Sequence, residues 1–145
     1  MATEEAHDEA EIRHLMDRMV DAIRATDLDE LRAGFARDMV SFDVGPALQC
    51  VGIEAKLNNW RQVFAFLQPP LNYEIRDLRV TVGRDVAFVH GINRLSGTLN
   101  GNRFGPWVRY TAGLRKIDGR LVIAHDQVSL PVDHTTGIAM LDSRT

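Results

Sequence analysis

The sequence has one cysteine, no long hydrophobic run and no cluster of basic residues, and each absence excludes a class of protein. Cys50 has no second cysteine to pair with, which excludes an intrachain disulfide and favours a reducing compartment. No apolar stretch approaches transmembrane length, and the first residues, MATEEAHDEAEIRHL, are acidic where a signal peptide would be basic. The net charge of -3 argues against a nucleic-acid partner. We therefore expect a cytoplasmic protein with no nucleic-acid or membrane partner.

Common catalytic and metal-binding motifs are also missing. The five histidines show no His-x-x-x-His spacing and no pairing with clustered carboxylates. Neither a glycine-rich phosphate loop nor a serine nucleophile elbow is present. The sequence therefore predicts no bound metal and no cofactor.

The chain is long enough for one domain with its own core. Its 145 residues are 45% hydrophobic and 26% charged, which is the composition of an ordinary globular protein. No internal repeat or low-complexity segment divides it. We expect a single domain over residues 1–145.

Three helices are expected first. Apolar residues recur at steps of three and four from about Glu4 to Ala25, a second short helix has Leu28, Leu31 and Phe35 on its apolar side, and a third lies between Gly52 and Leu67. The third ends before Pro69-Pro70.

Strands dominate the rest of the chain. A short strand alternates from Val40 to Val44, and four longer runs cover Tyr73–Val82, Val86–Thr98, Arg103–Lys116 and Leu121–Leu130. Short connections between the long runs, including Asp118-Gly119, are typical of an antiparallel meander. Glycines inside these runs permit strong curvature. The pattern predicts an α+β fold with helices packed on a curved antiparallel sheet and a pocket between them.

The last two long runs carry polar side chains at alternating positions. Trp107 and Arg109 share one side of their strand, and His125 and Gln127 share one side of the next. A sheet face that mixes such residues with aliphatic ones is typical of a partly polar cavity. We therefore expect these four residues to line the pocket.

Three segments carry a resemblance to a known family: FDVGPALQCVG, NYEIRDLRVTVGRDVAFVHGINRLSG and WVRYTAGLRKIDGRLVIAHDQVSLP. With the order of elements, they resemble the SnoaL-like and ketosteroid-isomerase-related branch of the nuclear transport factor 2-like superfamily. The resemblance covers nearly the whole chain. It implies a cone-shaped, cystatin-like roll with a pocket, frequent homodimers, and functions that include isomerases, cyclases, dehydratases, epoxide hydrolases and non-enzymatic modules. Fold alone does not choose among these functions.

The resemblance also suggests where an acid would act. Matching by element places Asp43 where ketosteroid isomerases carry their general base. The positions of their two oxyanion donors match Met19 and Ala112, so steroid isomerisation by that mechanism is not expected. Cyclases of the SnoaL type also use an acid in an apolar pocket, and here Asp43 and Asp126 both remain candidates.

The hypothesis from the sequence is proton-transfer chemistry with Asp43 as base and with Arg109 and His125 polarising or protonating an oxygen. Each has a structural alternative: Asp43 as a carboxylate that caps a strand end, Arg109 as the partner of a buried acid, and His125 as a hydrogen-bonded core residue. Further ligand contacts are expected from Met16, Met19, Trp60, His90, Trp107 and Gln127.

Three functions remain open. The first is an enzyme acting on a small, largely apolar molecule, the second is a protein that binds such a ligand without catalysis, and the third is a dimeric assembly module with a filled core. A homodimer is expected for the first function, and the third depends on a dimer.

Overall fold

The three expected helices are present. The structure, a computed structural model, describes residues 2–143. Its helices are α1 (Ala2–Arg24), α2 (Leu28–Arg32) and α3 (Ile53–Phe66). The side chain of Asp27 caps α2 by accepting a hydrogen bond from the backbone N–H of Glu30 at 3.1 Å. Phe35, expected on α2, instead begins the first strand.

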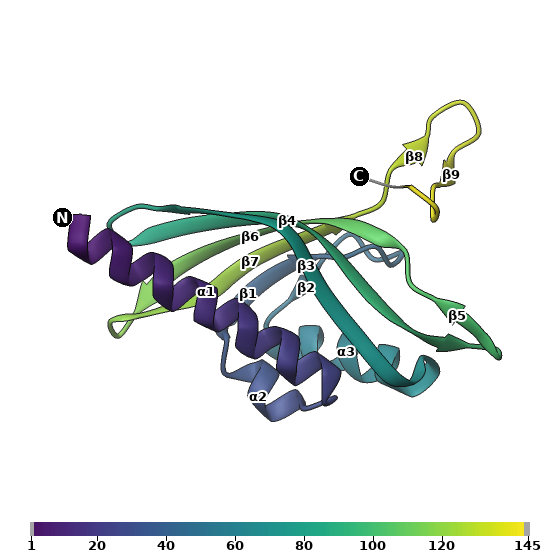
Figure 1. Cartoon of the computed structure of the whole chain (residues 1–145), viewed down its shortest axis with the longest axis horizontal. Coiled ribbons are helices and arrows are strands. Elements are labelled where there is room, and N and C mark those ends of the chain that lie inside the picture. Colours follow the sequence, from purple (N-terminus) through teal and green to yellow (C-terminus); the bar gives the residue numbers. More distant parts are fainter. Residues whose placement is uncertain (1, 144–145) are drawn as a thin grey trace.

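The strands form one large sheet and one small hairpin. The large sheet contains β1 (Phe35–Phe42), β2 (Cys50–Val51), β3 (Gln68–Val82), β4 (Val86–Leu99), β5 (Asn102–Phe104), β6 (Trp107–Ile117) and β7 (Arg120–Ser129). Their spatial order is β2-β1-β7-β6-β4-β3, with β5 paired to β4 (Figure 1). The separate hairpin consists of β8 (Val132–Asp133) and β9 (Ile138–Ala139). The α+β class is confirmed.

The sheet is mixed, which corrects the expectation of a purely antiparallel one. β3, β4, β6 and β7 form the expected meander, but β1 pairs with β7 in parallel, with Ser41 opposite Asp126 and Phe42 opposite Gln127. A parallel neighbour needs a long connection, and here α3 and five strands lie between β1 and β7 in the chain. This register brings the end of β1 beside Asp126.

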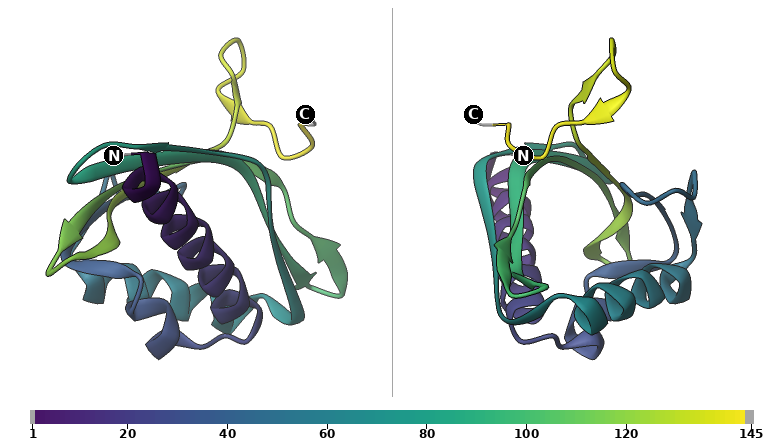
Figure 2. Two further views of the ribbon diagram at one scale, coloured as in Figure 1. Left: turned by 60° about the vertical axis from the view of Figure 1, so that its left-hand side comes forward. Right: turned by 90° about the vertical axis from the view of Figure 1, so that its right-hand side faces the viewer.

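The sheet curls, and α3 closes one side of the curl (Figure 2). α1 packs mainly along β3. It also contacts β7, where the backbone N–H of Leu121 donates a hydrogen bond to the side chain of Glu11 on α1 at 2.8 Å. At Gly97 a Cβ atom would lie 2.7 Å from side-chain atoms of Leu67 and Leu71, so only glycine allows this close approach to β4. The core therefore lies between the inner face of the sheet and the helices.

The chain after β7 leaves the body of the domain. The β8–β9 hairpin projects away from the sheet (Figures 1 and 2), and Val132 and Ile138 on it are exposed. Within residues 2–143, none of the helices combines the length and the apolar character needed to cross a membrane.

Candidate functional site

The candidate site is a pocket of about 220 Å³ between α3 and the inner face of the sheet, which we call the α3 pocket. Most of its wall is apolar, and polar groups are confined to a few positions. It is lined by Asp43, Val44, Lys56, Asn59, Trp60, Val63, Phe66, Leu67, Tyr73, Leu95, Phe104, Pro106, Val108 and Val128. An apolar pocket with a few convergent polar groups is the usual form of a small-molecule site.

Helical spacing explains why α3 supplies so much of the wall. Lys56, Asn59, Trp60 and Val63 recur at three- and four-residue steps, so they lie on one face of the helix. That face points at the sheet.

A buried cluster of charged groups lies at one end of the α3 pocket. Lys56 is 3% exposed, and its Nζ lies 3.2 Å from Oδ2 of Asp126 and 3.4 Å from Oδ2 of Asp43. Nζ also donates to Oγ of Ser41 at 3.0 Å, and that hydroxyl donates to Oδ1 of Asp126. Each buried charge therefore has partners, as buried ions require.

Asp43 is the carboxylate of this cluster that faces the pocket. It follows β1 directly, and its side chain is 27% exposed, against 3% for Asp126. One oxygen accepts from the backbone N–H of Val44 at 2.8 Å, and the other accepts from Asn59 at 3.3 Å and from Lys56. These bonds fix the carboxylate while leaving it accessible to a ligand. Of the two acids weighed from the sequence, Asp43 lines the α3 pocket and Asp126 does not.

A second, uncharged polar group lies on the sheet side of the same pocket. Oη of Tyr73 accepts a hydrogen bond from the side-chain amide of Asn93 at 2.6 Å. The Tyr73 ring lies edge-on to Trp60, with centroids 6.4 Å apart. Burial raises the pKa of Tyr73 far above its usual value, so the phenol stays protonated.

Two of the predicted site residues line the α3 pocket, Asp43 and Trp60. Asp126, the other acid weighed from the sequence, lies behind Asp43 in the charged cluster. The sequence therefore located the acidic end of the site and one aromatic wall.

Four predicted residues lie on the opposite face of the sheet, which is a correction. Arg109 alternates with Val108 and Tyr110, and those two point inward, so Arg109 points outward and is exposed. His90 and Gln127 share that outer face, because both are register partners of Thr111. Trp107 also lies there, with Arg76 stacked 4.2 Å from its ring centroid. None of these four is a wall of the α3 pocket.

His125 is likewise placed away from Asp43. Its neighbour Asp126 points inward, so His125 points outward, where its Nδ1 lies 2.7 Å from the carbonyl oxygen of Val40. Its ring packs edge-on against Phe42, with centroids 4.7 Å apart. The hydrogen-bonded contact agrees with one part of the structural alternative for His125, but the residue lies on the outer face of the sheet and not in the core.

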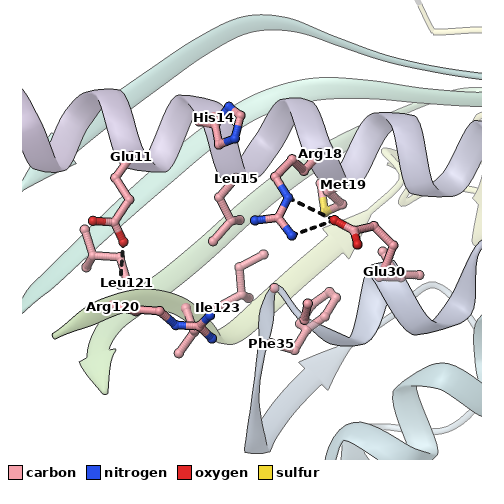
Figure 3. A pocket seen from close by; sticks show the side chains of 14 residues that line it. Glu11, His14, Leu15, Arg18, Met19, Glu30, Phe35, Arg120, Leu121 and Ile123 are labelled. Atoms are coloured by element: carbon pink, nitrogen blue, oxygen red, sulfur yellow. Dashed lines mark hydrogen bonds and ion pairs between the residues drawn. The ribbon is translucent and has the colours of Figure 1, made fainter. Parts of the chain in front are cut away.

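The two methionines also lie outside the α3 pocket. Met16 is 1% exposed in the hydrophobic core. Met19 lines a different and smaller hollow of about 90 Å³ between α1, α2 and the start of β7 (Figure 3). Arg18 and Glu30 form an ion pair across that hollow, with an N–O distance of 2.6 Å. Arg18 and Glu30 are thus each other's partners in that hollow, and Glu11 there is bonded to the backbone N–H of Leu121.

Sequence reasoning missed three polar residues of the site, Lys56, Asn59 and Tyr73, and of these Lys56 carried a recognisable signal. Its position between Ile53 and Trp60, three residues after the first and four before the second, places it on the apolar stripe of α3. A lone lysine on such a stripe signals a buried cation that needs acidic partners. Those partners come from β1 and β7, which no local pattern brings together.

Comparison with known proteins agrees with this architecture. Residues 12–133 match the family model described as the SnoaL-like domain. The chain belongs to the SnoaL-like family. It is therefore a member of the nuclear transport factor 2-like superfamily, as the resemblance had implied.

Solved structures extend the likeness across the whole SnoaL-like chain. A nuclear transport factor 2-like protein of unknown function from Pseudomonas putida is 28% identical, with a TM-score of 0.86 over 100% of this chain and 99% of that one. A protein described as a putative scytalone dehydratase from Novosphingobium aromaticivorans is 14% identical, with a TM-score of 0.79 over the same shares of the two chains. A ketosteroid isomerase-like protein from Erwinia carotovora is 23% identical, with a TM-score of 0.70 over 83% and 93%. No match is found among functionally curated proteins.

Proposed function

We propose that this SnoaL-like protein binds a small, largely apolar molecule in the α3 pocket and transfers a proton on it, with Asp43 as the base. The observation that supports this most is the convergence of Asp43, Lys56 and Asn59 at one end of an otherwise apolar pocket. A general base needs to reach a ligand within hydrogen-bond distance. Asp43 is the carboxylate of the charged cluster that meets this condition.

In this proposal Lys56, and not Arg109 or His125, is the cationic side chain beside Asp43. Its ammonium group lies between the two carboxylates and balances one of their two negative charges. It keeps Asp126 paired in the interior and holds one oxygen of Asp43 in place. A proton taken from a ligand would be accepted by the other lone pairs of Asp43, while the apolar wall excludes water.

Proton abstraction can be tested by following hydrogen–deuterium exchange at carbon next to the carbonyl of α-tetralone, a compact bicyclic ketone, by proton NMR. We expect the wild-type protein to accelerate exchange and Asp43→Asn to abolish the acceleration while retaining affinity. Asp38→Asn is the matched control, because Asp38 is exposed and pairs with Arg115 outside the pocket. Acceleration by Asp43→Asn equal to that of the wild type would exclude Asp43 as the base.

Ligand binding without catalysis is the alternative function. The hydrogen bonds from Lys56 and Val44 to Asp43 favour it, because together they engage both carboxylate oxygens. Binding of α-tetralone without accelerated exchange would support this alternative.

We also propose that the protein acts as a homodimer in the cytoplasm. The outer face of the sheet supports the dimer, because Phe42 and Phe88 are 39% and 48% exposed there, on either side of His125. The single cysteine supports the reducing compartment. Sedimentation of Phe88→Lys tests the dimer: we expect the wild type to sediment as a dimer and the variant as a monomer.

A further inference from the structure

The charged group that a ligand meets at the acidic end of the α3 pocket is the carboxylate of Asp43. Its side chain is 27% exposed, whereas that of Lys56 is 4% exposed. Val44, Lys56 and Asn59 donate hydrogen bonds to its two oxygens. A carboxylate offers about four lone pairs, so Asp43 can accept a further hydrogen bond from a ligand in the pocket.

The ammonium group of Lys56 has no donor to spare for a ligand. It carries three N–H donors, and its Nζ lies 3.0 Å from Oγ of Ser41, 3.2 Å from Oδ2 of Asp126 and 3.4 Å from Oδ2 of Asp43. The amide of Asn59 presents its NH2 group to Asp43, because a carboxylate only accepts. The carbonyl oxygen of that amide is thus a second acceptor beside Asp43.

The charges of the cluster do not balance. Asp43 and Asp126 carry two negative charges, and Lys56 carries one positive charge. Among the described residues, Lys56 is the only cationic side chain that lines the α3 pocket. One negative charge therefore lacks a countercharge beside an apolar wall, where an unpaired charge is costly. A ligand cation would supply the countercharge, whereas a ligand carboxylate or phosphate would add repulsion.

We propose that the α3 pocket binds a compact, apolar amine, whose protonated amino group donates hydrogen bonds to Asp43 and to the carbonyl oxygen of Asn59. The apolar wall, which includes Trp60, holds the hydrocarbon part of the ligand. A hydrogen bond between two charged groups is about twice as strong as a neutral one, so Asp43 is a specificity-determining residue. This inference rests on the proposed use of the α3 pocket as a ligand site, but it does not require proton transfer.

Binding of four probes to the wild-type protein tests the ligand class. 2-Aminotetralin, 2-tetralol, tetralin and tetralin-2-carboxylate share one bicyclic skeleton and present an ammonium group, a hydroxyl group, no polar group and a carboxylate. By calorimetry at about pH 7, where an alkyl amine is protonated, we expect the amine to bind about 10- to 100-fold more tightly than tetralin. The alcohol should lie between them, and the carboxylate should bind most weakly. An alcohol that binds as tightly as the amine would overturn the inference.

Asp43→Asn tests the charge at nearly constant shape. The change leaves Lys56 paired with Asp126 in the interior. We expect the affinity for 2-aminotetralin to fall by about tenfold or more, with the affinity for tetralin unchanged. Asp38→Asn is the matched control, because it removes an exposed carboxylate that pairs with Arg115 outside the pocket. Equal losses of amine affinity in the two variants would overturn the inference.

Asn59→Leu covers the case in which Asp43→Asn disturbs the cluster. This change removes the second acceptor and keeps every charge, so the amine affinity should fall by about threefold to tenfold, the effect of one hydrogen bond, and the tetralin affinity should not fall. Equal weakening of amine and tetralin in both variants would overturn the inference.

The outcome for the amine is distinct from the outcome for proton transfer. Amine binding that depends on Asp43, without hydrogen exchange on α-tetralone, would support this inference and contradict the proton-transfer proposal. Exchange that depends on Asp43, with the amine bound no more tightly than tetralin, would overturn this inference and support proton transfer. Absence of binding by all four probes would overturn the inference.

Discussion

Both faces of the large sheet carry polar side chains, but those on the inner face are buried and those on the outer face are exposed. The inner face carries Asp126, Tyr73 and Tyr110, all at most 7% exposed, and it borders the α3 pocket. The outer face carries Arg109, His90 and Gln127, all exposed. The difference shows that a polar residue on a strand is a candidate for ligand binding only if it lies on the face that borders the pocket. Four predictions, from the largest expected effect to the smallest, test how far the two faces differ.

The largest effect is expected from Lys56→Met. This change leaves Asp126 buried without its cation, and breaking a buried ion pair costs about 3–5 kcal/mol. Urea denaturation measures the change in unfolding free energy. Arg109→Met on the outer face is the control, with an expected change within about 0.5 kcal/mol. Equal losses in the two variants would remove the distinction between the faces.

Alkaline pH should weaken the fold through the inner-face tyrosines. Burial raises the pKa of Tyr73 and Tyr110, so above about pH 10 the unfolded chain releases protons that the folded chain retains. Their contribution to stability is complete below that pH and falls as pH rises, by up to about 1.4 kcal/mol per pH unit for each tyrosine. Urea titrations at about pH 9 and 11 should show this loss, and Tyr110→Phe should reduce it. An identical loss in Tyr110→Phe would contradict the assignment of this group.

A smaller loss is expected from His125→Ala. The change removes the contact between Nδ1 and the Val40 carbonyl and the edge-on contact with Phe42. Together these contribute about 1–2 kcal/mol. Affinity for α-tetralone should stay at the wild-type value, as measured by calorimetry. A large loss of affinity without a loss of stability would contradict the position of His125 outside the α3 pocket.

Gln127→Ala should have the smallest effect. Gln127 is exposed on the outer face, so the unfolding free energy should change by less than about 0.5 kcal/mol. Ligand affinity should not change. A loss of dimerisation in sedimentation would place Gln127 at the subunit contact, and a loss of ligand affinity would contradict its position outside the pocket.

Local patterns predicted the elements well. The apolar stripe on α1, the breaks at Pro69-Pro70 and Asp118-Gly119, and the four-strand meander all follow from spacing within one segment, and the structure confirms them. The parallel pairing of β1 with β7 did not follow, because it joins residues about 85 positions apart that share no local signal.

The site was predictable only in part, for a related reason. Asp43 was found because it falls in the expected Val40–Val44 strand, at a position that the family resemblance marks; in the structure it directly follows β1. Strand alternation correctly separated Arg109 from Val108, but it did not say which side is interior when both sides mix apolar and polar residues. Lys56 was missed because its acidic partners lie on two distant strands.

The two tryptophans of the chain provide the most direct test of the central claim, that ligands bind the inner face of the sheet beside Asp43 and Lys56. Trp60 lines the α3 pocket, and Trp107 lies on the outer face. Proton–nitrogen NMR would follow the indole N–H signal of each, with Trp60→Phe and Trp107→Phe providing the assignment. On titration with α-tetralone, the account predicts a shift of the Trp60 signal and a stationary Trp107 signal. A shifting Trp107 signal beside a stationary Trp60 signal would contradict it.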